Sequence, residues 1–242
     1  MKDTLNSAQT RRALIKSALV MAGGVAVSAC TTRGVTASVQ MPKPAPAIPV
    51  PAVVAHPVAP APAVARRAGM APAGVRPELF RRAVAALDRH SMSIASHDRI
   101  AIADFSVSSS LPRFFLINMG NGQVESLLVS HGSGSDPAHT GWLQRFSNDP
   151  GSNATCEGAF VTSDYYFGKH GASQRLIGLD ATNNNALDRA IVVHGAKYAT
   201  AEHMATYGKL GRSQGCFAVG PNELDMVFLR LGPGRLIFSA KV

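Results

Sequence analysis

The sequence predicts an α+β domain, mainly β with a few short helices, over residues 78–242. Two observations support this prediction: strand-like apolar runs dominate this part of the chain, and helical spacing of apolar residues occurs in only two places. The strand-like runs cover residues 100–107, 114–119, 124–129, 158–162, 175–179, 190–193 and 235–239. A segment of about 165 residues is long enough to enclose one hydrophobic core.

Local patterns predict two helices and one hairpin. A first helix is expected from Pro77 to Arg89, because proline suits the first turn and apolar residues then recur at helical spacing. A second helix is expected over residues 222–231, and the Gly-Pro-Gly at 232–234 ends it. Residues 121–122 are Asn-Gly, which predicts a tight hairpin between two of the strands.

Positive charge is concentrated outside this domain. The chain carries 24 Lys and Arg against 15 Asp and Glu, a net charge of +9. Residues 1–29 account for +3 and residues 30–77 for +5, which leaves +1 for residues 78–242. We therefore expect no nucleic-acid partner. Beyond residue 30 no uninterrupted apolar stretch approaches the roughly 18 residues of a membrane span, which argues against a polytopic membrane protein.

Residues 1–29 have the layout of an export signal, with a basic start, a short apolar run and small residues at the end. Arg11 and Arg12, followed by an apolar pair and Lys16, resemble a twin-arginine motif; an ordinary Sec signal is the alternative. Val-Ser-Ala-Cys at 27–30 resembles a lipobox, which implies lipidation of Cys30; a simple cleavage site beside a cysteine is the alternative. These signals predict a periplasmic protein anchored to a membrane by its lipid. Thr31, which is not an aspartate, favours the outer membrane.

Residues 30–77 form a predicted spacer between the anchor and the domain. This part of the chain holds ten of the fifteen prolines, mixed with alanine and without any acidic residue. Such a composition cannot bury a core and favours an extended polyproline form, which would reach up to roughly 145 Å at about 3.1 Å per residue. The alternative is a merely tolerated, unstructured linker.

A cysteine and a histidine are the candidates for catalysis. Cys216 lies in a small, polar, glycine-containing loop at 211–217, and His194 follows an apolar strand-like run. A thiolate is the nucleophilic form of cysteine, and a neighbouring histidine exchanges its proton. A buried inert cysteine and a core histidine are the structural alternative. Because His194 precedes Cys216, the chain order disfavours a papain-like enzyme.

These segments resemble the L,D-transpeptidase catalytic domain of bacterial cell-wall enzymes, especially its murein branch. The matching segments are 130–132, 146–148, 166–171, 178–179, 189–196 and 210–216, and together they cover roughly residues 100–240. Two positions depart from the family pattern. Many members have histidine where this chain has Gln214, and arginine or asparagine where it has Ala218. The second departure leaves the substrate contacts more open than the nucleophile.

The resemblance implies a mixed β-sandwich and a role for several residues. Cys216 would be the nucleophile, His194 the general base and acid, and the Gly195 carbonyl the group that orients His194. The amides of Gly215 and Cys216 would form the oxyanion hole. Arg212 and Ser213 would order the loop or hold a substrate carboxylate, although Arg212 has a solvated surface charge as its alternative.

Other residues are weaker candidates for substrate contact. His131 and His170, which both begin His-Gly pairs, and Tyr166 are predicted to line the cleft; structural roles are the alternative. The histidine spacings fit no standard zinc pattern, so no metal is expected. No cofactor is expected either. Cys156 is interpreted as a free thiol, and a regulatory disulfide with Cys216 is the alternative.

The implied reaction acts on peptidoglycan stem peptides. Cys216 would attack the peptide bond after the L-centre of a diamino acid, a D-amino acid would leave, and the acyl group would pass to an amine of a second stem. Transfer to water would make the enzyme an L,D-carboxypeptidase instead. A non-catalytic murein-binding lipoprotein is the alternative from a different functional class.

Overall fold

The computed structural model describes residues 70–242. The predicted export signal, the lipidation site Cys30 and nearly all of the predicted spacer lie outside the described residues, so these assignments stay predictions. Within residues 70–242, no helix has both the length and the apolar character that crossing a membrane requires.

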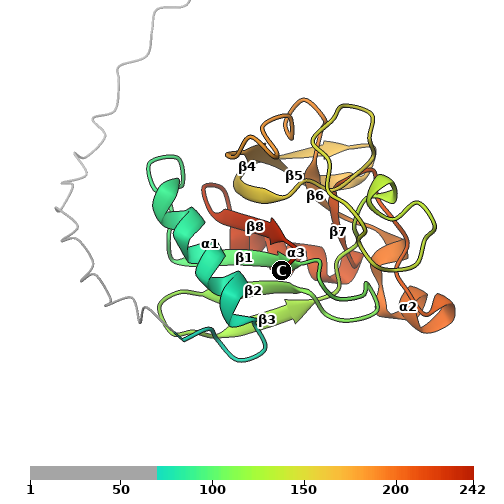
Figure 1. Ribbon diagram of the computed structural model, residues 1–242, viewed down its shortest axis with the longest axis horizontal. Helices are drawn as coiled ribbons and strands as arrows, with labels where there is room; N and C mark the ends of the chain where they lie inside the picture. Colours follow the sequence, from blue (N-terminus) through green and yellow to red (C-terminus); the bar gives the residue numbers. More distant parts are fainter. Residues whose placement is uncertain (1–69) are drawn as a thin grey trace, which may run out of the picture. The chain divides into compact units, whose positions relative to one another are not determined.

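One mixed sheet of eight strands forms the framework of the domain (Figure 1). The strand order is β3-β2-β1-β8-β4-β5-β6-β7, with parallel pairing in β1/β8 and β6/β7 and antiparallel pairing elsewhere. The strands are β1 Arg99–Asp104, β2 Phe114–Asn118, β3 Val124–Leu127, β4 Gly158–Gly168, β5 Gly171–Gly178, β6 Val192–Gly195, β7 Phe217–Val219 and β8 Leu236–Ala240. Together with three short α-helices, this sheet confirms the predicted mainly β, α+β class.

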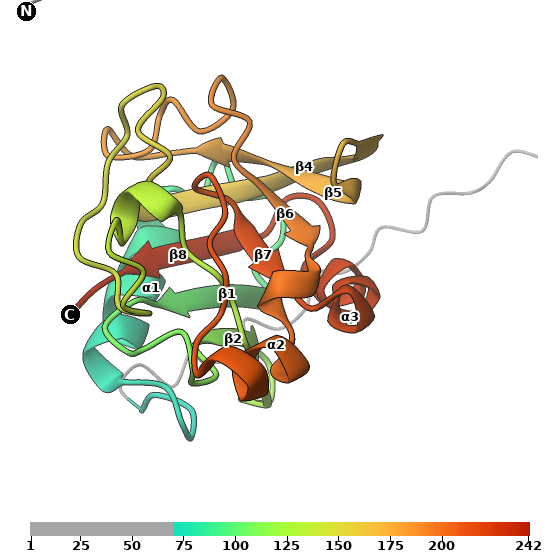
Figure 2. The same cartoon turned by 90° about the vertical axis from the view of Figure 1, so that its right-hand side faces the viewer.

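Helix α1 (Pro77–Arg89) covers one face of the sheet. Proline at its start and the buried residues Leu79, Ala83, Ala86 and Leu87 agree with the predicted helix. These side chains pack with apolar residues of β1, β2, β4 and β8 in one cluster. Figure 2, turned by 90°, shows α1 on the side of the sheet away from α3 (Pro221–Leu231).

The opposite face of the sheet encloses the main core. Every strand contributes a buried side chain to the same cluster, and α3 adds Leu224, Val227 and Leu231. Phe217 of β7 lies at its centre, with ring centroids 5.5 Å from Phe160 and 6.3 Å from Phe105 and Phe114. Because Phe217 directly follows Cys216, this aromatic packing fixes the backbone beside the candidate nucleophile.

One predicted hairpin is present, and several other elements differ from the predicted ones. The predicted hairpin at Asn121-Gly122 is present between β2 and β3, with Gly122 at a φ of 75°. Strands β4 and β5 extend beyond the predicted runs and form a long hairpin, whose register shifts between Thr162 and Tyr165. The three-residue strand β7 and helix α2 (Ala201–Tyr207) are additional elements; α2 buries none of its residues and depends on its Thr200 cap.

Candidate active site

The loop before β7 holds Cys216 in a fixed position. Its side chain is buried, with the residue 7% exposed, and Sγ donates to the Ala190 carbonyl oxygen at 3.5 Å. Gly215 has a φ of 112°, and a Cβ at this position would lie 2.6 Å from the Ala154 carbonyl oxygen. The loop therefore needs glycine immediately before the cysteine.

Ser213 organises this loop from within. Its hydroxyl donates to the Cys216 carbonyl at 2.7 Å and accepts the Gly215 N–H at 3.1 Å. Its backbone N–H donates to the His131 carbonyl at 3.0 Å, and its own carbonyl accepts the Ser133 N–H at 2.8 Å. Since Ser213 is only 5% exposed, its contacts are those of a residue that orders the loop.

His194 lies on the neighbouring strand. Strands β6 and β7 run parallel, and His194 pairs with Ala218, two residues after Cys216. His194 Nδ1 lies 3.0 Å from the Gly195 carbonyl oxygen. A carbonyl oxygen can only accept, so this contact requires the proton on Nδ1 and leaves Nε2 with its lone pair. The predicted orienting contact of Gly195 is thus present.

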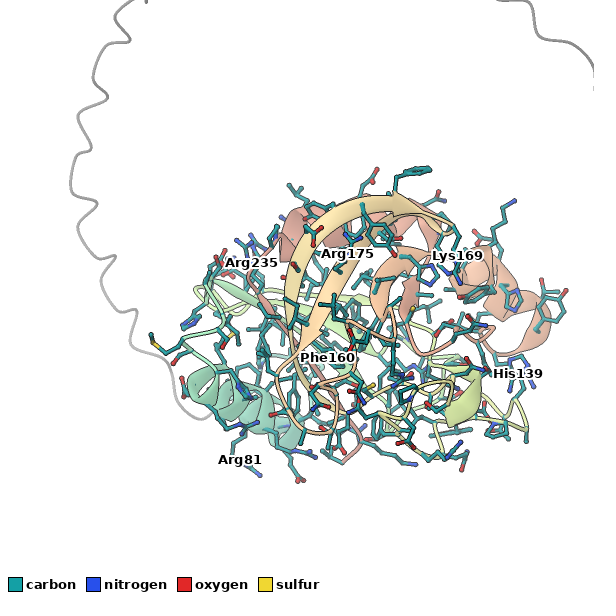
Figure 3. All side chains as sticks on the ribbon, turned by 90° about the horizontal axis from the view of Figure 1, so that it is seen from above. Arg81, His139, Phe160, Lys169, Arg175 and Arg235 are labelled. Atoms are coloured by element: carbon teal, nitrogen blue, oxygen red, sulfur yellow. The ribbon has the colours of Figure 1, made fainter. Side chains whose placement is uncertain are left out.

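The turn between β4 and β5 covers His194. The rings of His170 and His194 stack with centroids 4.3 Å apart and an interplanar angle of 20°. His170 itself is exposed, as is Lys169, which Figure 3 shows at the end of this hairpin. The long hairpin therefore brings two basic residues from a distant part of the sequence to the histidine.

Burial sets the protonation of the pair. Burial raises the pKa of the Cys216 thiol, and the Val192 amide and the positive charges of Lys169 and Arg189 oppose this rise. Burial also lowers the pKa of His194; the Gly195 contact opposes this effect, whereas the charges of His170 and Lys169 add to it. Both shifts favour a neutral thiol and a neutral imidazole, and a neutral pair of this kind reacts by proton transfer when the nucleophile attacks.

Comparison with known protein families identifies the domain. Residues 72–239, more than half of the chain, match the family model described as the L,D-transpeptidase catalytic domain. The chain belongs to this family. The resemblance inferred from the sequence motifs is thereby confirmed.

Solved L,D-transpeptidase structures share low sequence identity with this domain. An L,D-transpeptidase from Mycobacterium smegmatis is 13% identical over 59% of this chain and 58% of that chain, with a TM-score of 0.36. One from Xylanimonas cellulosilytica is 17% identical over 65% and 68%, with a TM-score of 0.35. L,D-transpeptidase 1 of Mycobacterium tuberculosis is 15% identical over 59% and 61%, with a TM-score of 0.32.

This chain spans only 59% of the length of the first solved structure that it matches, a complex of the L,D-transpeptidase LdtMt1 with imipenem. No curated protein matches this chain in sequence.

Two predicted substrate contacts of this L,D-transpeptidase domain are engaged within the protein. Arg212 Nη1 donates to the carbonyls of Asp136 and Pro137 and so holds the nucleophile loop, residues 211–217, against residues 136–137. His131 is 1% exposed; its Nδ1 accepts from Arg113 at 2.8 Å and its Nε2 lies 3.4 Å from Asp136. In this conformation His131 therefore has the structural role that the sequence analysis gives as the alternative to substrate contact.

The predicted oxyanion-hole amides differ in availability. The Gly215 N–H is already bonded to the Ser213 hydroxyl, so it would have to release that bond to serve an oxyanion. Tyr166 is partly exposed on β4, where the Arg175 guanidinium lies 4.1 Å from the centroid of its ring. Both assignments stay predictions.

The cysteines of the described region are free thiols. Neither Cys156 nor Cys216 forms a disulfide, in agreement with the free-thiol interpretation of Cys156. Cys156 is fully buried and accepts from Arg189 Nη1 at 2.7 Å. Burial raises the pKa of this thiol, against the effect of Arg189. Residues 70–242 contain no group of three His, Cys, Asp or Glu side chains placed to hold a metal.

Three basic residues near the site have no role in the sequence-based prediction. Lys169 and Arg189 act on the charge of Cys216, and Arg113 holds His131. Lys169 and Arg189 lie inside the matching segments 166–171 and 189–196, which is the only sequence signal for them. Arg113 has no such signal, because it lies outside these segments and nothing in the sequence around it indicates that its side chain is fully buried.

The stability of the domain should depend on pH through His131. Burial and the nearby Arg113 charge lower its pKa from 6.5 to about 4. Between pH 6.5 and about pH 4, His131 binds a proton in the unfolded chain but not in the native protein, so the free energy of unfolding should fall as pH falls. The loss would reach up to about 3 kcal/mol. Urea unfolding at pH 7 and pH 4.5 measures it, and His131→Asn should show a smaller pH dependence; an equal dependence would contradict the assignment.

Proposed function

We propose that this L,D-transpeptidase domain acts on peptidoglycan stem peptides through a thioester on Cys216. The observation that carries the proposal is the pairing of β6 with β7. It sets Cys216 beside the strand of His194, whose Nδ1 contact with Gly195 leaves Nε2 to take a proton. Membership of the family supplies the substrate class.

The proposed acylation step uses both residues. The Cys216 thiol gives its proton to His194 Nε2 as Sγ attacks the carbonyl carbon that follows the L-centre of the diamino acid. The carbonyl oxygen becomes an oxyanion near the Cys216 amide, which is our candidate donor. The carbon–nitrogen bond then breaks, His194 returns its proton to the leaving amine, and a D-amino acid departs from the thioester.

Deacylation reverses these roles. An amine of a second stem attacks the thioester carbon and gives a proton to His194 Nε2. The carbon–sulfur bond breaks, and the thiolate recovers the proton from His194. Water in place of the amine would give the carboxypeptidase outcome, and both outcomes use the same residues.

Product analysis tests this proposal against its alternatives. The purified full chain should convert disaccharide-tetrapeptides into cross-linked dimers and release one D-amino acid for each dimer. Tripeptide products without dimers would indicate a carboxypeptidase. Binding to peptidoglycan without either product would support the non-catalytic alternative and would overturn the proposal.

Lys169 should set the acidic limit of activity. Its positive charge lowers the pKa of His194, which must be neutral to act as base. Lys169→Gln should therefore raise the pKa of His194 and move the acidic limb of the kcat/KM profile to higher pH. Lys197→Gln, which removes another exposed lysine, is the matched control. An unchanged acidic limb in Lys169→Gln would show that this charge does not act on the base.

We also propose export and anchoring through the N-terminal segment. The twin-arginine-like signal and the lipobox-like residues at 27–30 support a lipid on Cys30, a periplasmic domain and, through Thr31, an outer-membrane location. Cys30→Ala should move the protein from the membrane fraction to the soluble fraction of cells. Unchanged membrane association in this variant would refute the lipid anchor.

A further inference from the structure

A small pocket lies beside the nucleophile loop. Its volume is about 210 Å³, and it is lined by Pro150, Gly151, Asn153, Asp188, Arg189 and Gln214. Gln214 stands two residues before Cys216. The pocket is smaller than the roughly 300 Å³ at which sites for drug-sized ligands begin, so it suits a group about as large as one amino acid.

Arg189 connects this pocket to the reacting cysteine. Its Nη2 lies 3.2 Å from the place that a Cβ of Gly215 would take. The next residue, Ala190, accepts the Cys216 thiol hydrogen bond at 3.5 Å. The positive charge of Arg189 therefore lies beside the loop that carries Cys216.

The protein holds the Arg189 guanidinium in place. Nη1 donates to the Ser147 carbonyl at 2.8 Å and to Cys156 Sγ at 2.7 Å, and Nη2 donates to the Ala154 carbonyl at 2.6 Å. Within residues 70–242 these contacts use three of the five N–H donors of an arginine. A fixed guanidinium with two donors left is ready for a carboxylate, which it binds through charge-assisted hydrogen bonds.

The two charges of the pocket indicate its ligand. Asp188 and Arg189 present opposite charges side by side, and Asn153 and Gln214 add amide side chains. An α-amino acid carries an ammonium and a carboxylate on one carbon, which matches this pair. In the proposed reaction, the leaving amine and the attacking amine reach the same carbon from the same side, because each step is the reverse of the other.

We infer that this pocket binds the α-amino acid group on the amine side of the reacting bond, first in the leaving residue and then in the acceptor. The carboxylate of this group lies at Arg189. Its nitrogen faces Asp188 as an ammonium in the released residue and in the acceptor before attack, because in the intact donor this nitrogen belongs to the reacting amide bond. Before attack, the acceptor ammonium loses one proton to solvent. The free amine then attacks the thioester carbon and gives a second proton to His194 Nε2, and the departing Sγ recovers that proton from His194. The inference rests on the proposed function and adds an acceptor site to it.

Acceptor kinetics on the full chain test the inference. With a saturating tetrapeptide donor, the KM of the acceptor is measured for D-alanine and for D-alaninamide, which lacks the carboxylate. The variants are Arg189→Gln and Asp188→Asn, with Arg81→Gln on α1 and Asp225→Asn on α3 as controls for the same charge changes at exposed positions. Figure 3 shows Arg81 on α1. Comparing each acceptor between variants cancels the difference in basicity of the two amines.

Each charge should affect one group of the acceptor. Arg189→Gln should raise the KM of D-alanine roughly 10- to 100-fold more than that of D-alaninamide, the range for a charge-assisted hydrogen bond. Asp188→Asn should raise both KM values together, and the controls should change neither. An equal rise for both acceptors in Arg189→Gln would reduce Arg189 to a structural residue and overturn the inference.

If Arg189→Gln does not fold, the Asp188→Asn variant still tests the inference, because Asp188 is exposed and its replacement should leave the fold intact. Unchanged KM values in Asp188→Asn would also overturn the inference. Failure of the proposed function has a different signature, since the wild type would then form no thioester on Cys216. Transfer by the wild type, with acceptor KM values unchanged in both variants, would refute the pocket alone.

Discussion

Replacing Cys216 or His194 by alanine is expected to lower kcat/KM by roughly 10⁴-fold, and the double variant is expected to lose no more than either single variant. The two residues act on one proton and one bond, so removing either removes the whole chemical step. Steady-state rates of D-amino acid release from tetrapeptides, with the three variants and the wild type compared, measure the effect.

Cys216→Ser is the matched control for this prediction. The hydroxyl has nearly the shape of the thiol but a much higher pKa, so this variant should fold normally and remain at least about 10³-fold slower than the wild type. Independent, multiplicative losses in the double variant would contradict a shared mechanism. Substantial activity in Cys216→Ala would place the nucleophile elsewhere.

Arg113→Met is expected to be the most destabilising single change in the described domain. Arg113 is fully buried and donates to the carbonyls of Val129 and Val107 and to His131 Nδ1, at 2.8 to 3.0 Å. Burial lowers the pKa of Arg113 to about 9, so the group is still charged at pH 7. Removing it leaves the carbonyls of Val129 and Val107 and His131 Nδ1 without this donor, and we expect a loss of about 3–5 kcal/mol in the free energy of unfolding.

Urea unfolding at pH 7 measures this loss. Arg230→Met is the control, since it removes an arginine whose partner, Glu125, is partly exposed, and it should cost far less. Because the His131 carbonyl holds the Ser213 N–H, Arg113→Met should also loosen the nucleophile loop and slow the reaction. Equal stability of the two variants would show that the buried network contributes little.

The elements that the sequence predicts well are those with a local cause. Helix α1 has a proline at its start and an apolar stripe, α3 has a similar stripe and a glycine end, and the β2–β3 hairpin has Asn-Gly. Strand β7 is too short for an alternating pattern, and α2 has no buried face to produce one. The register shift between Thr162 and Tyr165 breaks the alternation in β4 and conceals its length.

In the candidate site too, the sequence predicts the residues that belong to a local motif and misses those that depend on distant contacts. Cys216 and His194 belong to segments with a recognisable motif, so the sequence alone points to them. The stacking of His170 on His194 depends on the long β4–β5 hairpin, and the contact of Arg189 with the Gly215 loop depends on the packing of residues 147–156. Such contacts join residues that are distant in sequence, and no local pattern reports them.

The central claim is that the acyl group passes through Cys216, and the mass of the trapped intermediate tests it most directly. The full chain is mixed with a tetrapeptide donor without an acceptor, quenched in acid and analysed by intact-protein and peptide mass. The account predicts an added mass equal to the mass of the donor less that of the free D-amino acid it releases, on the peptide that contains Cys216, and none on Cys216→Ala. Turnover with no adduct on Cys216, or with an adduct on another residue, would contradict it.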